Sequence, residues 1–213
     1  MKNVYFISGL GATKRSFQFL DLSFCNPVFV EWLEPLAKES LVSYAGRLMA
    51  TIPEEAPTIV GLSFGGMLAS EMALANPNAR VVLISSNKTS NEFPKWLRIG
   101  RYVPVYKWLP EGLVKNSKYL LQIVFGAKGK EQKAVQVQVL KETNIKFTRA
   151  AIDMILRWTT TKQAPNIIHI HGTADRLLPY KKVTADYTIK GGTHLMVMDN
   201  GEEISSILQT IIR

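Results

Sequence analysis

The segment Gly61-Leu62-Ser63-Phe64-Gly65-Gly66 constrains the fold of this chain more than any other part of the sequence. An apolar run, Thr58-Ile59-Val60, leads into it, and residues 67–75 carry apolar side chains at helical spacing. The pattern predicts a strand that turns sharply into a helix, with Ser63 at the turn. Glycines on both sides of Ser63 leave room for strand and helix to approach closely while the serine takes a strained, positive φ. A plain glycine-rich turn would show the same motif, so the motif alone leaves the role of Ser63 open.

Short apolar segments rich in β-branched residues recur along the chain and predict about six strands. They are Asn3–Ser8, Val28–Trp32, Thr58–Leu62, Arg80–Ser85, Ile167–His171 and Ala185–Ile189. Their hydrophobicity is nearly continuous, as in strands buried on both faces of a parallel sheet. Helical patterns lie between them, one after a predicted N-cap at Ser40 and one after the capping-box sequence Asn200-Gly201-Glu202-Glu203. Strands that alternate with helices indicate an α/β fold with a mostly parallel, doubly wound sheet.

The character of the sequence changes at Asn87, where prolines and aromatic-basic segments begin and long helical patterns follow. Residues 87–165 contain 15 Lys and Arg against 5 Asp and Glu, whereas the rest of the chain has 11 basic and 12 acidic residues. The basic excess behind the net charge of +9 therefore lies in this middle segment. The simplest organisation is a core formed by 1–86 and 166–213, with a helical cap, 87–165, inserted into it.

A serine hydroxyl needs a base before it can act as a nucleophile, and the chain has three histidines. His169 and His171 lie within a predicted strand, where a histidine is usually structural. His194 follows Gly191-Gly192-Thr193 on a loop between the last predicted strand and the last predicted helix. A carboxylate, Asp175, comes just after the strand Ile167–His171.

The order of these three side chains along the sequence supports a common site. Alone, Asp175 is typical of a turn and His194 of a surface loop. Each of Ser63, Asp175 and His194, however, follows the carboxyl end of a predicted strand, and these ends meet at one edge of a parallel sheet. The chain order Ser, Asp, His is also the one used by hydrolases with a nucleophilic serine on a strand-to-helix turn.

Three motifs resemble the α/β-hydrolase superfamily: G-L-S-F-G-G at the turn, H-G-T-A-D-R-L-L-P around Asp175, and G-G-T-H-L-M-V around His194. The resemblance covers the predicted core and identifies no narrower family in the cap. It implies a nucleophile at Ser63, an orienting acid at Asp175 and a general base at His194. It also implies an oxyanion hole formed by the backbone amides of Leu10 and Phe64.

The resemblance is incomplete at the N-terminal end of the fold. Ser8-Gly9 stands where many relatives have His-Gly. The chain also begins directly at the strand before the oxyanion loop, so it is expected to lack the first two strands of the fold.

The function implied is a serine hydrolase that cleaves a small-molecule carboxylic ester or thioester through an acyl-enzyme. The same triad also supports a lyase or a C–C bond hydrolase, and a low-turnover ligand-binding receptor can keep all three residues. Dehalogenase chemistry is disfavoured because it needs a carboxylate at position 63. No cofactor is expected, and His169-x-His171, an ordinary strand pattern, indicates no metal site.

Aromatic residues of the basic segment are candidates for binding the substrate: Trp96, Tyr102, Tyr106 and Trp108. They can equally form the core of the cap, with the Lys and Arg side chains on a solvated face. A sharper hypothesis is an apolar pocket with a basic mouth that receives anionic substrates or faces a membrane surface. No nucleic-acid-binding motif accompanies the charge, so nucleic acid is not an expected partner.

The single cysteine, Cys25, cannot form an internal disulfide and is expected to be a buried thiol. No apolar run reaches the roughly 20 residues that a membrane-spanning helix needs. The apolar residues 4–10 are better explained as a strand than as part of a signal peptide. These features favour a cytoplasmic protein.

Overall fold

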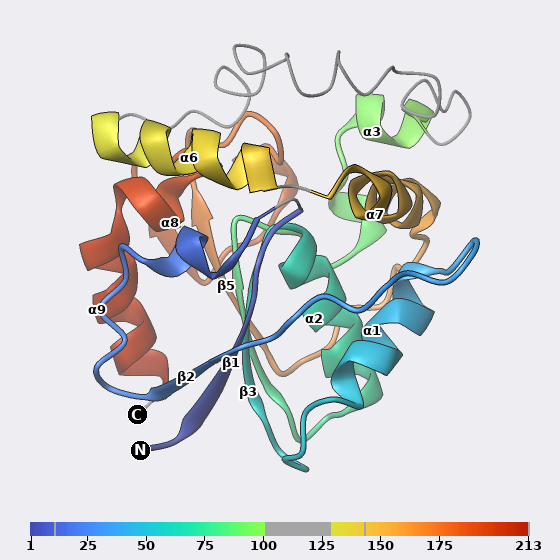
Figure 1. Ribbon diagram of the computed structural model, residues 1–213, viewed down its shortest axis with the longest axis horizontal. Helices are drawn as coiled ribbons and strands as arrows, with labels where there is room; N and C mark the ends of the chain where they lie inside the picture. Colours follow the sequence, from blue (N-terminus) through green and yellow to red (C-terminus); the bar gives the residue numbers. More distant parts are fainter. Residues whose placement is uncertain (11, 101–128, 143, 213) are drawn as a thin grey trace.

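Six parallel strands form one sheet in the order β2-β1-β3-β4-β5-β6 in the computed structural model of the chain (Figure 1). The structure describes residues 1–10, 12–100, 129–142 and 144–212. The strands are β1 (Asn3–Ile7), β2 (Asn26–Phe29), β3 (Thr58–Leu62), β4 (Arg80–Ile84), β5 (Ile167–Gly172) and β6 (Tyr187–Ile189). Every neighbouring pair is parallel, which confirms the predicted sheet.

Helices cover both faces of this sheet (Figure 1). One face carries α1 (Leu41–Met49) and α2 (Phe64–Ala75). The other carries α8 (Met196–Asp199), α9 (Gly201–Ile212) and the 3₁₀ turn η1 (Lys14–Phe17). The helix predicted after Ser40 is confirmed, because the Ser40 side chain accepts the Ser43 amide hydrogen at 3.1 Å as an N-cap.

Two apolar cores lie on either side of the sheet because successive side chains of each strand point to opposite faces. In β1, Tyr5 and Ile7 belong to the core beneath α1 and α2, and Val4 and Phe6 belong to the core beneath α8 and α9. All five residues of β3 are buried. The nearly continuous hydrophobicity of these strands in the sequence thus reflects burial on both faces.

Two strands, β2 and β6, differ from the sequence prediction by more than one residue at an end. The strand predicted at Val28–Trp32 is Asn26–Phe29. Within the described residues β2 pairs with β1 alone, and an edge strand of this kind tolerates Pro27. The strand predicted at Ala185–Ile189 begins at Tyr187. Ala185 and Asp186 lie outside the strand, and the Asp186 carboxylate accepts the His169 amide hydrogen at 2.8 Å.

Helical elements occupy the described part of the segment 87–165, as predicted. They are η2 (Ser90–Glu92), α3 (Lys95–Gly100), α6 (Lys130–Glu142) and α7 (Ile145–Arg157). In Figure 1, α6 and α7 lie across the end of the sheet at which the parallel strands finish. The definition of 87–165 as a separate cap domain stays a prediction.

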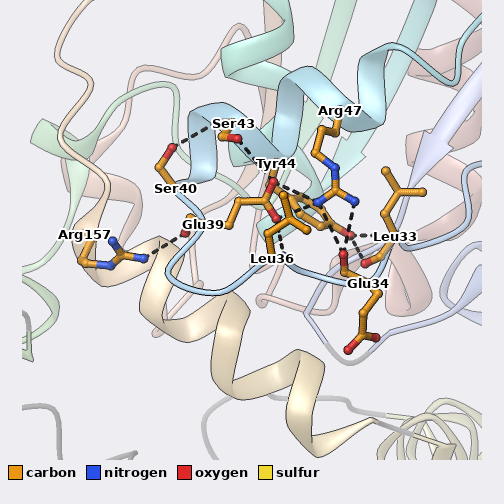
Figure 2. Close-up of polar contacts among 9 residues, drawn as sticks. All are labelled: Leu33, Glu34, Leu36, Glu39, Ser40, Ser43, Tyr44, Arg47 and Arg157. Carbon is orange, nitrogen blue, oxygen red and sulfur yellow. Dashed lines mark hydrogen bonds and ion pairs between the residues drawn. The ribbon is translucent and has the colours of Figure 1, made fainter.

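A buried carboxylate organises the loop before α1 (Figure 2). The Glu39 side chain is 1% exposed and accepts hydrogen bonds from Arg47 Nη1 at 2.9 and 3.0 Å. It also accepts the Leu36 amide hydrogen at 2.8 Å and the Ser43 hydroxyl hydrogen at 3.3 Å. These bonds satisfy the charge of Glu39 and hold the loop in one conformation.

This loop in turn holds α7 over the sheet. Arg157 Nη2, at the end of α7, donates to the Glu39 carbonyl oxygen at 2.9 Å (Figure 2), and Lys146 Nζ, at its start, lies 2.8 Å from a Glu34 carboxylate oxygen. Between these contacts, the Phe147 ring packs against Trp32, with ring centroids 5.0 Å apart. The Trp32 ring also contacts Phe64, the first residue of α2. The contacts fix α7 relative to the turn that carries Ser63.

The lone thiol of the chain lies inside the fold. Cys25 is buried, as expected, and burial raises the pKa of its thiol. Across the described residues, no helix combines the length and the hydrophobicity needed to span a bilayer.

Candidate active site

Ser63 occupies a tight turn between β3 and α2, as the glycine motif predicts. Its φ is 51° and its ψ is −115°, a conformation that costs about 1–3 kcal/mol in a residue with a side chain. The strain is held by surrounding hydrogen bonds: the Ser63 amide donates to the Ile84 carbonyl at 2.9 Å, and the Ser86 hydroxyl donates to the Ser63 carbonyl at 2.6 Å. A Cβ at Gly65 would lie 2.4 Å from the Ile7 carbonyl oxygen, so this close approach requires glycine.

A continuous chain of hydrogen bonds joins the three residues singled out from the sequence. Ser63 Oγ lies 2.9 Å from His194 Nε2, and His194 Nδ1 lies 2.8 Å from Asp175 Oδ2. Because the Asp175 carboxylate can only accept, His194 carries its proton on Nδ1. Its Nε2 lone pair then accepts the Ser63 hydroxyl hydrogen. The arrangement can remove a proton from Ser63 Oγ and return it to another group.

The Asp175 carboxylate is buried but fully hydrogen-bonded. Its Oδ1 accepts the amide hydrogens of Leu177 and Leu178, each at 2.9 Å, and its Oδ2 faces His194. Burial alone would raise the pKa of Asp175, but the electrostatic attraction and hydrogen bond of His194 and the backbone bond from Leu178 hold that pKa below its ordinary value. The carboxylate is therefore ionised at neutral pH.

Direct backbone contact brings the loops of Asp175 and His194 together. The Ala174 amide donates to the Gly192 carbonyl at 2.9 Å, and the Gly191 amide donates to the Thr173 hydroxyl at 2.8 Å. A Cβ at Gly172 would lie 2.2 Å from the Gly192 carbonyl oxygen. The glycines of both loop motifs thus allow the acid and the histidine to meet.

A cavity of about 330 Å³ opens beside Ser63 and His194. Among the described residues that line it, the polar ones are Ser16, Ser63, Gln136 and His194, and Asp, Glu, Lys and Arg are absent from this described lining. The remaining walls are mostly apolar and come from the loop after β1, from α2, α3 and α7, from the loop after β5, and from the loop after β6 with α8. They include Leu10, Phe64, Met67, Leu97, Ile152, Ile155, Leu156, Leu177, Leu178 and Met198.

Leu10 and Phe64, the predicted oxyanion-hole residues, both line this cavity beside Ser63. Phe64 is the first residue of α2, so its amide has no acceptor within the helix. The loop of Leu10 is closed by the Ser8 hydroxyl, which donates to the Ala12 carbonyl at 2.9 Å. Ser8, the departure from the usual His-Gly, therefore anchors the loop. The oxyanion role of the two amides stays a prediction.

The structure does not test the aromatic substrate contacts predicted between residues 87 and 165. Trp96 belongs to α3, and its neighbour Leu97 lines the cavity. Tyr102, Tyr106 and Trp108 lie outside the described residues. The lining residues from α7 and from the loop after Asp175 were not predicted. The signal that could have found those of α7 is the apolar period of residues 145–157, which is typical of a helix with one buried face.

His169 and His171 are buried side by side in β5, behind the site. His171 Nε2 donates to the Leu178 carbonyl at 2.8 Å and lies 3.5 Å from Asp175 Oδ2, while its Nδ1 lies 3.1 Å from His169 Nε2. Burial lowers the pKa of both rings, and the proximity of His171 and Lys88 lowers that of His169 further. Both histidines are therefore neutral in the folded protein.

This pair is expected to make the protein less stable in mild acid. Below the unfolded-state pKa of 6.5, the unfolded chain binds protons that the folded protein excludes from His169 and His171. The free energy of unfolding should therefore fall as the pH falls below about 6.5, by up to about 1.4 kcal/mol per pH unit for each histidine. Urea unfolding between pH 7.5 and 5.5 measures the slope. The variant His169→Gln should flatten it, whereas equal stability at both pH values would contradict the expectation.

Comparisons with known proteins agree with the fold. Neither protein-family models nor curated proteins match the sequence, whereas many solved structures match the structure. An enol-lactonase from Burkholderia xenovorans has a TM-score of 0.76 and 14% sequence identity, over 99% of this chain and 91% of that chain. A lipase-esterase related protein from Clostridium acetobutylicum has a TM-score of 0.72 and 15% sequence identity, over 99% of this chain and 94% of that chain. A meta-cleavage product hydrolase from Pseudomonas fluorescens has a TM-score of 0.67 and 19% identity, over 100% and 90%. Together with the all-parallel six-stranded sheet, these similarities show that the chain has the α/β-hydrolase fold.

Proposed function

We propose that the protein is a serine hydrolase that cleaves carboxylic esters or thioesters of small molecules. The observation that carries the proposal is the hydrogen-bonded series Ser63–His194–Asp175, which ends in a cavity beside Ser63. A strained serine, a histidine whose Nε2 lone pair faces that serine, and a buried carboxylate behind it are the parts that nucleophilic catalysis needs.

The reaction follows from these positions. His194 Nε2 takes the hydroxyl proton as Ser63 Oγ attacks the carbonyl carbon, and Asp175 stabilises the imidazolium that forms. The Leu10 and Phe64 amides stabilise the oxyanion, each such donor contributing about 3 kcal/mol in comparable sites. His194 then gives its proton to the leaving alcohol or thiol. Water, deprotonated by His194, attacks the acyl-enzyme. His194 returns that proton to Ser63 Oγ as the acyl–oxygen bond breaks and the acid is released.

The lining of the cavity favours a largely apolar substrate. An anionic group placed there would lose its hydration without meeting a positive charge, because the described lining residues include no Lys or Arg. Any role of the basic cap is therefore expected away from the acyl pocket. Among the structures compared, the names esterase, lactonase and hydrolase support hydrolysis as the reaction class.

Labelling with a fluorophosphonate tests the proposal, because this reagent requires an activated serine. One equivalent is expected to attach, and peptide mapping should place it on Ser63. A series of p-nitrophenyl esters and acyl thioesters should be hydrolysed, and turnover should stop as labelling proceeds. Labelling without turnover of any ester would favour the lyase, C–C hydrolase or receptor alternatives. Absence of labelling would overturn the assignment of Ser63.

A further inference from the structure

One side chain in the cavity has no role in the proposed reaction. Gln136, on α6, is only 5% exposed, and neither its Oε1 nor its Nε2 has a hydrogen-bond partner in the described part of the chain. The residue lines the same cavity as Ser63 and His194. Buried polar groups are nearly always paired in folded proteins, because an unpaired one has lost its hydrogen bonds to water. The amide is therefore available to a bound molecule.

The surroundings of Gln136 define what that molecule can be. α6 packs against η1, whose Ser16 is buried and also lines the cavity. Of the lining residues that the structure describes, Gln136 and Ser16 are the polar ones outside the Ser63–His194 pair, and the other walls offer mostly Leu, Ile and Met side chains. A carboxamide presents both a donor and an acceptor. Its complement is a group that also donates and accepts.

We propose that Gln136 determines specificity by binding a neutral hydrogen-bonding group, a hydroxyl or a carboxamide, on an otherwise apolar substrate. The inference rests on the proposed function, since the cavity is assigned to the substrate of Ser63. The group must be neutral because the cavity walls, within residues 1–10, 12–100, 129–142 and 144–212, hold no charged side chain to pair with an ion. A substrate without such a group leaves the amide unpaired, and sites of this kind discriminate strongly against the analogue that lacks the polar group.

The test compares p-nitrophenyl hexanoate with its 3-hydroxy, 6-hydroxy and terminal carboxamide derivatives, and hexyl hexanoate with its 6-hydroxyhexyl counterpart. We expect at least one polar derivative to have the higher kcat/KM in the wild type. The variant Gln136→Met keeps the length of the side chain but cannot make its hydrogen bonds. It should lower the ratio of kcat/KM for the polar derivative to kcat/KM for the plain ester by about tenfold. Gln138→Met, on an exposed position of the same helix, is the matched control and should keep the wild-type ratio.

A binding experiment distinguishes failure of this inference from failure of the proposed function. Calorimetric titration of the Ser63→Ala protein measures the affinity for the same ester pairs without chemistry. The preference for the polar derivative should disappear in the double variant Ser63→Ala/Gln136→Met. If esters are not turned over but this preference is seen and lost as expected, the subsite stands and the hydrolase proposal fails. If the ratio of polar to plain ester is the same with and without Gln136, the inference is wrong, whatever the protein hydrolyses.

Discussion

Replacing Ser63 with alanine is expected to lower the kcat of ester hydrolysis by roughly 10⁶-fold and to abolish fluorophosphonate labelling. In the proposed reaction the Ser63 hydroxyl oxygen forms the acyl-enzyme, and His194 Nε2, which lies 2.9 Å from it, takes the hydroxyl proton. Residual catalysis would come from the oxyanion donors and from binding alone. Initial rates with a p-nitrophenyl ester measure the loss, and the acyl-enzyme burst should vanish as well.

This substitution should leave the fold intact. The Ser63 hydroxyl bonds to His194, whereas the turn itself is held by the Ser63 backbone through Ile84, Ser86 and Met67. The melting temperature should therefore stay close to the wild-type value. Ser206→Ala, an exposed serine on α9, is the control and should retain full turnover. Turnover that survives Ser63→Ala would show that another group is the nucleophile.

Replacing Asp175 with asparagine is expected to lower kcat by about 10⁴-fold, with a much smaller change in KM. The two oxygens of Asp175 have different partners, and this decides the outcome. Oδ1 accepts two amide hydrogens, from Leu177 and Leu178, so the amide oxygen of the variant will take that place. Its NH₂ group must then face His194. The imidazole would present its Nδ1 lone pair to that group and carry its proton on Nε2, where it cannot accept the Ser63 proton.

The measurement is the steady-state kinetics of Asp175→Asn beside Asp21→Asn, whose carboxylate lies on an exposed loop and should not affect the rate. The tautomer of His194 can be read directly from ¹⁵N chemical shifts of the imidazole. The expected variant has a folded structure, nearly normal KM and a proton on Nε2. A variant that keeps more than a tenth of the wild-type kcat would contradict the role given to Asp175.

The site depends on α7 as much as on the sheet edge. Ile152, Ile155 and Leu156 form one wall of the cavity, and contacts at both ends hold α7: Lys146 and Phe147 at its start and Arg157 at its end. The anchor at the end of α7, the Glu39 carbonyl, belongs to a loop in which the buried Glu39 carboxylate is paired with the partly exposed Arg47. The outer pair, Lys146 with Glu34, is exposed and contributes little by comparison. The shape of the cavity is therefore coupled to residues 33–40, which do not line it.

Much of the fold could be predicted from the sequence because its signals are local. A strand buried on both faces requires a short apolar run, and the elbow requires small residues where strand and helix touch, so Thr58–Leu62 and Gly65 stand out. Ser63, Asp175 and His194 could be grouped from their positions in the sequence because parallel topology sends the ends of strands to one edge. The ends of a strand were harder to predict where pairing with a neighbouring strand sets them. This is the case for β2, whose Pro27 fits at the edge of the sheet.

The sequence by itself determined the α/β architecture, the turn at Ser63 and the chain order of Ser63, Asp175 and His194, because short-range sterics and burial patterns impose them. Only the tertiary structure decided that His194 carries its proton toward Asp175, that Ser8 closes the loop of Leu10 and that Gln136 is buried with no partner among the described residues. Each of these depends on atoms brought together by folding or on the exclusion of water, and neither residue type nor spacing specifies such contacts. Ser63 could therefore be singled out from the sequence as a candidate nucleophile, whereas the walls of the cavity beside it were set by the tertiary structure.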